Sequence, residues 1–242
     1  MFPVSRSEMR ALGWDRPDIL LVTGDAFVDH PSFGVAVIAR VLQGAGYRVA
    51  VLAQPDPGNP GAFMEMGIPR LFAGITPGNM DSMVNHYTSL NRLRSDDSYS
   101  PGGLPGKRPD RAELKYANVL QRVMKGVPLV LGGLGPSTRR VSHYDFWSDR
   151  VRKSVLLDAK ADILVYGMAE NTMLEVARRL DAGEALSGIR GTCRFASVVR
   201  PLPGDVELPS HEEAASSPEA FLRMTRLLEE NQNPWNAARL LQ

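Results

Sequence analysis

The chain has 242 residues, 43% of them hydrophobic and 23% charged, which is typical of a folded globular protein with one large domain, or one domain and an appendage. Because 28 Lys and Arg nearly balance 27 Asp and Glu, we expect neither nucleic acid nor an anionic membrane as a partner. The apolar runs are too short to cross a bilayer, and the lone Cys193 allows no internal disulfide and no thiolate cluster, so we expect a protein of the reducing cytoplasm.

The first half of the chain alternates short apolar runs with amphipathic segments. Three apolar runs, which contain β-branched residues, predict buried strands at 18–23, 47–53 and 71–75. Apolar residues that recur every three or four positions predict a helix over 33–45, and a second helical stretch is predicted near 81–90. The following segment, 92–111, is rich in Arg, Pro and Gly, and we expect it to be a functional loop or mobile.

The second half continues the same alternation. Strands are predicted at 127–131 and 162–166. Helices are predicted over 111–125, over 148–157 and after Gly167, the last with an apolar face of Leu174, Val176, Ala177 and Leu180. From 200 to 218 the chain turns to Pro, Gly, Ser and Glu, which indicates a linker, and 219–230 is predicted to be a docking helix.

Five strands that alternate with helices predict an α/β fold. Parallel strands need crossover connections of a dozen or more residues, as these segments supply, so we expect a doubly wound, Rossmann-like domain with a mostly parallel five-stranded sheet. We place this domain at 1–199 and assign 200–242 to the linker and docking helix.

The candidate site follows from this fold, because ligands of open parallel sheets bind beyond the carboxyl ends of the strands. Four of the segments that follow strands are rich in glycine or acidic residues, which lets a ligand approach the backbone and the N–H groups of the next helix. The candidate cofactor contacts are Asp25, Asp29, His30, Ser32 and Gly34 after the first strand, Gly78 and Asn79 after the third, Gly132 and Gly133 after the fourth, and Gly167 and Glu170 after the fifth. The alternative is that these segments are only tight turns and helix caps.

The adjacent Asp29 and His30 leave several interpretations open. They are compatible with a metal-ligand pair, a general base with its orienting carboxylate, an axial ligand to a corrin-type cofactor, or a cap and a loop hydrogen bond. His86 and His143 lack the i, i+4 partners of metal-binding helices, so we expect no dedicated metal site.

A second candidate surface follows the fourth strand. Arg139 and Arg140 precede His143 and Tyr144, and guanidinium groups beside aromatic rings suit a phosphate, a stacked ring or a partner protein. An ion-paired entry to a surface helix is the alternative.

Several longer motifs carry a family resemblance. They are ALGWD at 11–15, VTGDAFVDHPSFG at 22–34, GNMDSM at 78–83, GKRPDR at 106–111 and HYDFWSD at 143–149. Together they resemble the amino-terminal region of the YgiQ-type (UPF0313) radical SAM proteins over residues 11–195. The tail, with LPS at 208–210 and NPWNAAR at 233–239, resembles the segment that precedes the catalytic barrel of that family.

The resemblance implies an amino-terminal domain similar to the cobalamin-binding domains found ahead of many radical SAM barrels, with 30–34 and Gly132–Gly133 at the ligand-facing turns. Cobalamin is a possible ligand, although Asp29 and His30 do not match the base-off signature Asp-x-His-x-x-Gly. The [4Fe–4S] cluster and S-adenosylmethionine are implied for the full family protein only, because its Cys-x₃-Cys-x₂-Cys motif is not in this chain.

The sequence therefore favours an accessory domain that binds a cofactor or substrate in its crevice and presents it to a radical SAM barrel in the same chain or in another subunit. One alternative is a partner-binding module whose crevice is empty and whose helix at 219–230 docks on another subunit. Another is a stand-alone hydrolase that uses Asp29 and His30.

Overall fold

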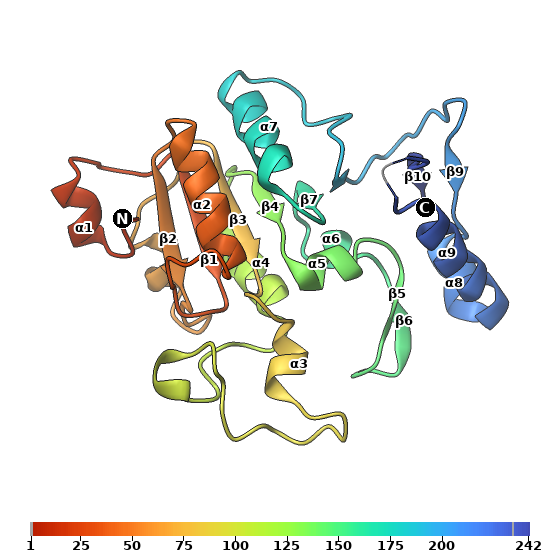
Figure 1. The fold of residues 1–242 in the computed structure, drawn as a ribbon, viewed down its shortest axis with the longest axis horizontal. Coiled ribbons are helices and arrows are strands. Elements are labelled where there is room, and N and C mark those ends of the chain that lie inside the picture. Colours follow the sequence, from red (N-terminus) through yellow and green to blue (C-terminus); the bar gives the residue numbers. More distant parts are fainter. Residues whose placement is uncertain (1, 234) are drawn as a thin grey trace. The chain divides into compact units, whose positions relative to one another are not determined.

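The computed structural model describes residues 2–233 and 235–242. Residue 234, which belongs to the tail motif at 233–239, lies outside the described residues. The chain divides into two compact units, one made of 1–140 with 155–195 and the other of 141–154 with 196–242 (Figure 1). The segment 141–154 thus groups with the C-terminal residues, while the division at 199/200 stays a prediction.

The first unit is built on a six-stranded sheet in the order β2-β1-β3-β4-β7-β8. Its strands are β1 (Ile19–Thr23), β2 (Val49–Ala53), β3 (Phe72–Thr76), β4 (Leu129–Leu131), β7 (Ile163–Val165) and β8 (Thr192–Cys193). The first five run parallel to one another, which confirms the predicted mostly parallel sheet. β8 runs antiparallel to β7 and was not predicted, because two residues are too few to show a strand pattern.

Helices cover both faces of this sheet (Figure 1). The helices of the first unit are α1 (Arg6–Ala11), α2 (Gly34–Gly44), α3 (Ser82–His86), α4 (Ala112–Val123), α5 (Leu134–Thr138), α6 (Val155–Asp158) and α7 (Glu170–Asp181), with the 3₁₀ turns η1 (Pro60–Met64) and η2 (Pro101–Gly103), and α3 extends away from the sheet. α2 and α7 pack in one core layer with Ile19 and Leu21 of β1. α1, η1, α4 and α6 pack in the other layer with Leu20 and Val22. Successive residues of β1 are therefore buried on opposite faces, as a doubly wound fold requires.

The edge strands of the sheet are β2 and β8. At one edge the backbone N–H of Val51 in β2 donates to the carbonyl oxygen of Pro3, at 3.1 Å. At the other edge, β8 pairs with Leu164 and Val165 of β7.

Two helix predictions need correction. The helix predicted over 148–157 is wrong, because 143–152 forms an antiparallel hairpin of β5 (His143–Asp145) and β6 (Arg150–Arg152), and only α6 is helical. Asp149 adopts a left-handed backbone at the turn and accepts a hydrogen bond from the Tyr144 hydroxyl, both of which favour the hairpin. The helix predicted near 81–90 ends at His86, where Tyr87 turns extended and pairs with Leu93.

The second unit contains the β5–β6 hairpin, the short parallel strands β9 (Val206–Glu207) and β10 (Leu240–Leu241), and the helices α8 (His211–Ser216) and α9 (Pro218–Glu230). α9 confirms the helix predicted over 219–230. Ser210 and Glu213 form a reciprocal capping box on α8, and Ser217 caps α9. None of the helices in the described part of the chain is both long and apolar enough to span a membrane.

A buried carboxylate joins the amino ends of three strands in the first unit. The Asp18 carboxylate, which precedes β1, accepts hydrogen bonds from Arg48 before β2 at 2.9 Å and from Arg70 before β3 at 2.7 Å. Burial acts to raise the pKa of Asp18, but the bonds from the two arginines outweigh it and hold the pKa well below its usual range.

Because the pKa of Asp18 is depressed in the folded protein, its contribution to stability is complete above its unfolded pKa of about 4 and is lost as pH falls through the folded value. We expect Asp18→Asn to lower the free energy of unfolding at pH 7 by about 2–3 kcal/mol. The difference from the wild-type protein should shrink between about pH 5 and pH 2, measured by urea unfolding at each pH. A difference that stays constant down to pH 2 would contradict this role.

Candidate functional site

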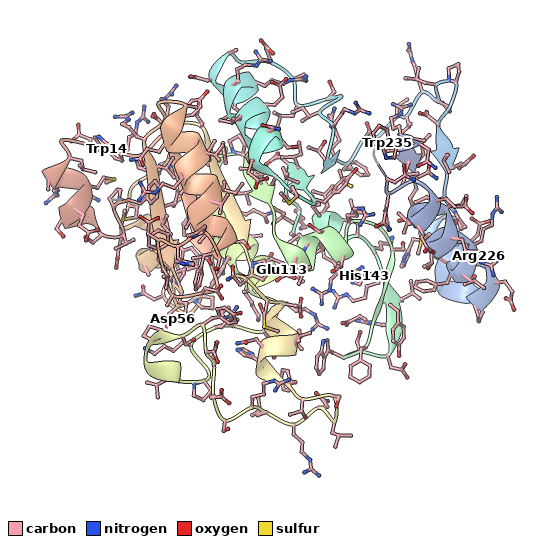
Figure 2. All side chains as sticks on the ribbon, viewed as in Figure 1. Trp14, Asp56, Glu113, His143, Arg226 and Trp235 are labelled. Atoms are coloured by element: carbon pink, nitrogen blue, oxygen red, sulfur yellow. The ribbon has the colours of Figure 1, made fainter. Side chains whose placement is uncertain are left out.

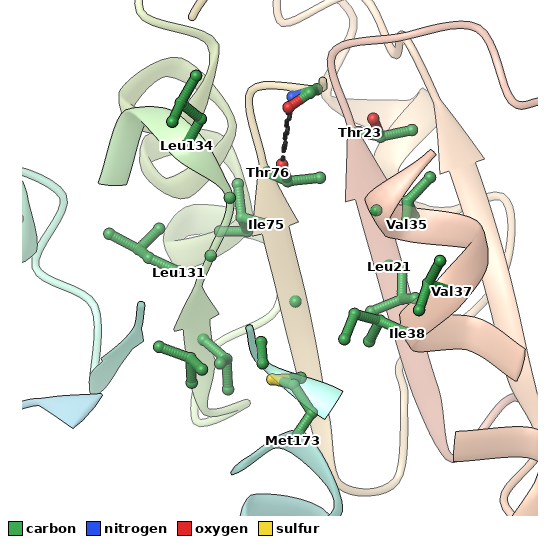
Figure 3. Close-up of a pocket in the computed structure, with 18 of the residues that line it drawn as sticks. Leu21, Thr23, Val35, Val37, Ile38, Ile75, Thr76, Leu131, Leu134 and Met173 are labelled. Atoms are coloured by element: carbon green, nitrogen blue, oxygen red, sulfur yellow. Dashed lines mark hydrogen bonds between the residues drawn. The ribbon is translucent and has the colours of Figure 1, made fainter. Parts of the chain in front are cut away.

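A cavity of about 310 Å³ lies at the carboxyl ends of the central strands of the first unit (Figure 3). Strands β1 and β3 are neighbours, yet the chain leaves β1 through α2 on one face and enters β3 from η1 on the other. Such a switch point between adjacent strands is where open α/β sheets form their ligand crevice. The cavity therefore occupies the place that the topology predicts.

The floor of the cavity is apolar and reaches down between α2 and α7. Its walls carry the side chains of Leu21, Val35, Ile38, Val130, Val165 and Met173. Gly74, in the middle of β3, faces this floor, and a Cβ at that position would lie 2.8 Å from Leu21 Cδ2. A larger residue would therefore either fill the cavity or push Leu21 into it.

Glycines and hydroxyl groups build the mouth. The Gly78 N–H donates to Thr76 Oγ1 at 3.2 Å, a bond drawn in Figure 3. Gly133 has φ +96°, and a Cβ there would lie 2.5 Å from the same oxygen. The Ser137 hydroxyl donates to the Gly133 carbonyl oxygen at 2.7 Å and accepts from the Gly167 N–H at 3.3 Å. Ser137 therefore joins the turns after β4 and β7, and the close approach of Gly133 to Thr76 brings the turn after β3 against them.

The structure brings most of the predicted cofactor contacts together. Asp25, Gly34, Gly78, Asn79, Gly132, Gly133, Gly167 and Glu170 all line the cavity. Asp29, His30 and Ser32 are exposed in the loop after β1 and are not among its lining residues. Whether any of these residues contacts a ligand stays a prediction.

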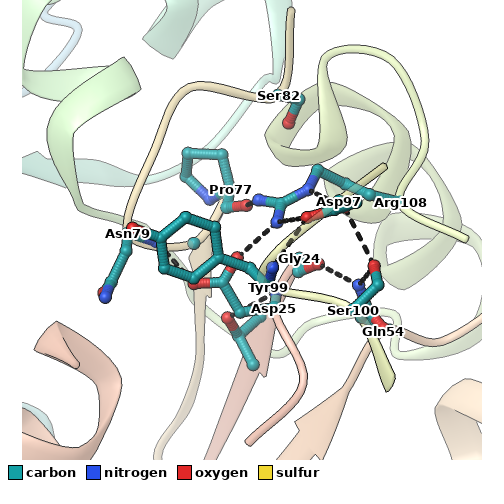
Figure 4. A network of polar contacts seen from close by, with 12 residues as sticks. Gly24, Asp25, Gln54, Pro77, Asn79, Ser82, Asp97, Tyr99, Ser100 and Arg108 are labelled. Carbon is teal, nitrogen blue, oxygen red and sulfur yellow. Dashed lines mark hydrogen bonds and ion pairs between the residues drawn. The ribbon is translucent and has the colours of Figure 1, made fainter. Parts of the chain in front are cut away.

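Asp25 belongs to a buried ion network (Figure 4). Its carboxylate lies 2.6 Å from Arg108 Nη2 and accepts a hydrogen bond from the Asn79 N–H at 2.6 Å. Arg108, whose side chain is fully buried, also contacts Asp97 at 3.4 Å and donates to the Pro77 carbonyl oxygen at 2.8 Å. Burial raises the pKa of Asp25, opposed chiefly by the charge of Arg108. Asp25 is therefore held by protein groups at the edge of the cavity.

The same network orders the long segment at 92–111. Asp97 accepts hydrogen bonds from the Tyr99 N–H and the Ser100 hydroxyl, both at 2.9 Å. Gln54 Nε2 donates to Ser100 Oγ at 2.7 Å and to the Gly24 carbonyl oxygen at 2.8 Å (Figure 4). These contacts argue against a mobile segment, and its role as a functional loop stays a prediction.

The side chains of Asp29 and His30 bind different partners. The Asp29 carboxylate pairs with Arg40 of α2, and His30 Nδ1 accepts the Ser32 N–H at 3.1 Å. Asn79 links this loop to the turn after β3, because its Nδ2 donates to the Ser32 carbonyl oxygen at 2.9 Å and its Oδ1 accepts the Gly34 N–H at 3.3 Å. His30 therefore makes a loop hydrogen bond, whereas Asp29 forms an ion pair and caps no helix, since the N-cap of α2 is Phe33.

The arginines after β4 also serve internal contacts. Arg139 pairs with Asp81, the N-cap residue of α3, and lies 3.7 Å from the buried Glu113 (Figure 2). Burial raises the pKa of Glu113, partly offset by the charge of Arg139. Arg140 stacks over Tyr166 at 4.9 Å from the ring centroid.

The other two residues of this candidate surface belong to the second unit, in β5. There, His143 Nδ1 lies 3.2 Å from the Val141 carbonyl oxygen, and the Tyr144 hydroxyl donates to Asp149. A role for the four residues Arg139, Arg140, His143 and Tyr144 in binding an anion or a partner stays a prediction.

Two sets of residues were missed by the sequence analysis. The cavity floor was one, although Gly74 inside a strand pattern is a known signal of close approach by a ligand or a side chain. The partners of Asp25 were the other, since nothing in the spacing links Asp25 to Asp97 and Arg108. Within residues 2–233 and 235–242 there is no group of three or more His, Cys, Asp or Glu side chains arranged to hold a metal ion.

Comparison with known proteins finds close relatives among UPF0313 proteins. The chain is 50% identical to one from Rhodopseudomonas palustris over 99% of its own length and 39% of the relative's. It is 46% identical to one from Methanocella arvoryzae over 99% of its length and 40% of the relative's. The match to one from Shewanella oneidensis is 57% identical and covers 83% of this chain and 25% of that protein. The chain thus spans two fifths or less of these relatives.

Among solved structures, the chain resembles the radical S-adenosylmethionine methyltransferase TsrM from Kitasatospora setae, with a TM-score of 0.49 and 18% identity over 74% of this chain and 28% of that chain.

Residues 1–242 match the family described as radical SAM N-terminal. This match and the UPF0313 relatives confirm the predicted resemblance. The chain belongs to the radical SAM N-terminal family, in the form carried by UPF0313 proteins.

Proposed function

We propose that this chain is the ligand-binding part of a radical SAM protein, which holds a small-molecule cofactor or substrate in the crevice of its first unit and presents it to a radical SAM domain supplied elsewhere. The observation that carries the proposal is the cavity at the β1/β3 switch point, with an apolar floor and a mouth of glycine turns. An apolar pocket with a few convergent polar groups is the usual form of a small-molecule site.

The iron–sulfur chemistry of the family does not fit the residues of this chain. A [4Fe–4S] cluster needs several thiolates, and the sequence has one cysteine. Burial raises the pKa of that residue, Cys193, to about 11, so it is a neutral thiol at pH 7. The relatives, which are at least 2.5 times longer, have room for a second domain, and we assign the cluster and S-adenosylmethionine to it.

The apolar crevice is compatible with part of a cobalamin, but His30 is not placed to be its axial ligand. The apolar floor suits a flat aromatic group, and Gly167, with open space around its Cα, leaves one side of the mouth free for a larger polar body. The exposed His30 accepts a backbone hydrogen bond through Nδ1 and is not a cavity residue. A corrinoid, when bound, supplies methyl transfer or electron transfer at cobalt.

In this proposal the residues of the chain bind and orient. The side chains of Leu21, Val130 and Met173 bury the apolar end of the ligand, which favours binding by about 25 cal/mol per Å² of apolar surface removed from water. Thr76 and Ser137 hold the turns, and Asn79 fixes the start of α2 against the turn after β3. None of these contacts requires the chain to carry out chemistry itself.

The first test is anaerobic titration of the chain with hydroxocobalamin, followed by absorbance and thermal unfolding. Ligand at about 100 times its Kd should stabilise the protein by about 2.7 kcal/mol and raise Tm by roughly 5–10 °C. Gly74→Val should abolish both signals, because the added side chain, or the displaced Leu21, occupies the cavity. His30→Ala should leave both signals intact.

The matched control is Gly44→Val, the same change at an exposed position of α2 with open space around it. It should bind like the wild-type chain, provided circular dichroism shows that each variant is folded. Unchanged spectra and Tm with the wild-type chain would remove cobalamin as the ligand. Unchanged Tm with S-adenosylmethionine and with 5′-deoxyadenosine as well would favour the module with an empty crevice.

The second test concerns the ion network that holds the crevice loops. Arg108→Met leaves Asp25 and Asp97 buried without their cation, so we expect a loss of about 3–5 kcal/mol in unfolding free energy. Arg108→Lys keeps the charge but not the forked geometry and should lose less. Lys107→Met, at an exposed neighbouring position, should change stability by no more than about 0.5 kcal/mol. Equal effects of Arg108→Met and Lys107→Met in urea unfolding would refute this role of the network.

A further inference from the structure

A small hairpin projects from the chain just after α3, and we call residues 86–94 the finger. Tyr87 and Leu93 form an antiparallel bridge, with the Thr88 N–H donating to the Arg92 carbonyl oxygen and the Arg94 N–H to that of His86, both at 2.8 Å. Asn91 closes the turn in a left-handed conformation. The finger is therefore a formed element and not an irregular loop.

One carboxylate fastens the base of the finger to the start of α4. Asp110 accepts from the Tyr87 hydroxyl at 2.9 Å and lies 2.6 Å from His86 Nδ1. The Arg94 guanidinium donates back across the base to the carbonyl oxygens of Val84 and Tyr87, both at 3.2 Å. The finger is thus held in place before any partner arrives.

The tip carries apolar side chains that the first unit does not cover. Leu90 and Leu93 are each 75% exposed, and Val84 below them is 44% exposed. Arg92 lies between the two leucines in sequence, and its side chain pairs with no acid among the residues that the structure describes. An ordered tip with two leucines and an unpaired cation is typical of a binding surface, since the entropy of ordering has already been lost.

The finger follows the crevice mouth closely in the sequence. It follows β3 on the same side of the sheet as the cavity mouth, because Gly78 and Asn79 at that mouth lie in the turn that leads into α3. Figure 1 shows the chain after α3, in yellow, extending away from the sheet. The finger therefore begins only a few residues after the mouth, at the end of α3.

We propose that the finger is a docking element for the radical SAM domain of the longer family members. That domain would bind Leu90 and Leu93 in an apolar recess rimmed by carboxylates. This inference rests on the proposed function, which requires that domain to face the crevice. The partner is the part of the longer relatives that this chain does not match, which is about three fifths of the R. palustris protein. A second copy of the chain is a poorer occupant, because two fingers would bring their Arg92 side chains together.

The test compares hydrogen exchange in this chain alone and in its fusion to the remaining part of the R. palustris relative. The N–H groups of Leu90 and Leu93 donate to no backbone acceptor in the finger, so they should exchange rapidly in the chain alone. In the fusion we expect their exchange to slow at least tenfold. Equal rates in the two proteins would overturn the proposal, and so would slowing in the chain alone that grows with concentration, which would identify a second copy as the occupant.

Variants connect the protection to the tip. In the fusion, Leu90→Glu with Leu93→Glu should return the exchange of the finger amides to the rate of the chain alone, because carboxylates replace the apolar contacts and oppose the acidic rim. Leu12→Glu, at another exposed leucine, should leave the protection intact. Protection that survives the double variant would refute the assignment. Hydroxocobalamin titration of the chain alone tests the crevice separately, so failure of docking and failure of ligand binding are distinguishable.

Discussion

The buried contact of Arg108 with Asp25 and Asp97 is the constraint on which the crevice depends. Two carboxylates in a protein interior are costly unless a cation and further donors satisfy them, and Arg108 reaches both from a segment more than 80 residues after Asp25. The requirement fixes the long loop against the end of β1. It also imposes close backbone approach, since a Cβ on Gly24 would lie 2.2 Å from the Pro77 carbonyl oxygen and one on Gly78 would lie 2.1 Å from Asp25.

The cavity results from two different kinds of restraint. Its mouth is held by hydrogen bonds between turns, such as those of Thr76 and Ser137, which tolerate little change in backbone position. Its floor is held only by apolar packing between α2, α7 and the sheet, and Gly74 removes side-chain volume where that packing would otherwise close. The mouth and the floor are therefore held by different interactions, hydrogen bonds at the mouth and apolar packing at the floor.

The pattern of residues predicted the architecture because the strands are buried on both faces. The apolar run at 19–23 and the periodic helix after it leave few other interpretations, and the position of the crevice follows from strand order. The hairpin at 143–152 was not predicted, because its two strands have three residues each and its turn depends on the left-handed backbone of Asp149. The ion pair of Asp25 could not be predicted either, because an acidic residue after a strand has the same sequence pattern whether it binds a ligand or an arginine. Arg108 reaches Asp25 only in the folded protein.

The structure of the two sheet edges affects how readily this chain pairs with strands of other molecules. The outward-facing N–H of Val51 in β2 donates to the Pro3 carbonyl oxygen, and Pro3 itself has no N–H. The other edge is β8, which has only two residues and runs antiparallel to β7. Unsatisfied edges invite strands from neighbouring molecules, which is the first step of fibril growth. The partly covered edge of β2 and the two-residue edge of β8 leave few backbone groups with which a strand of another chain could pair.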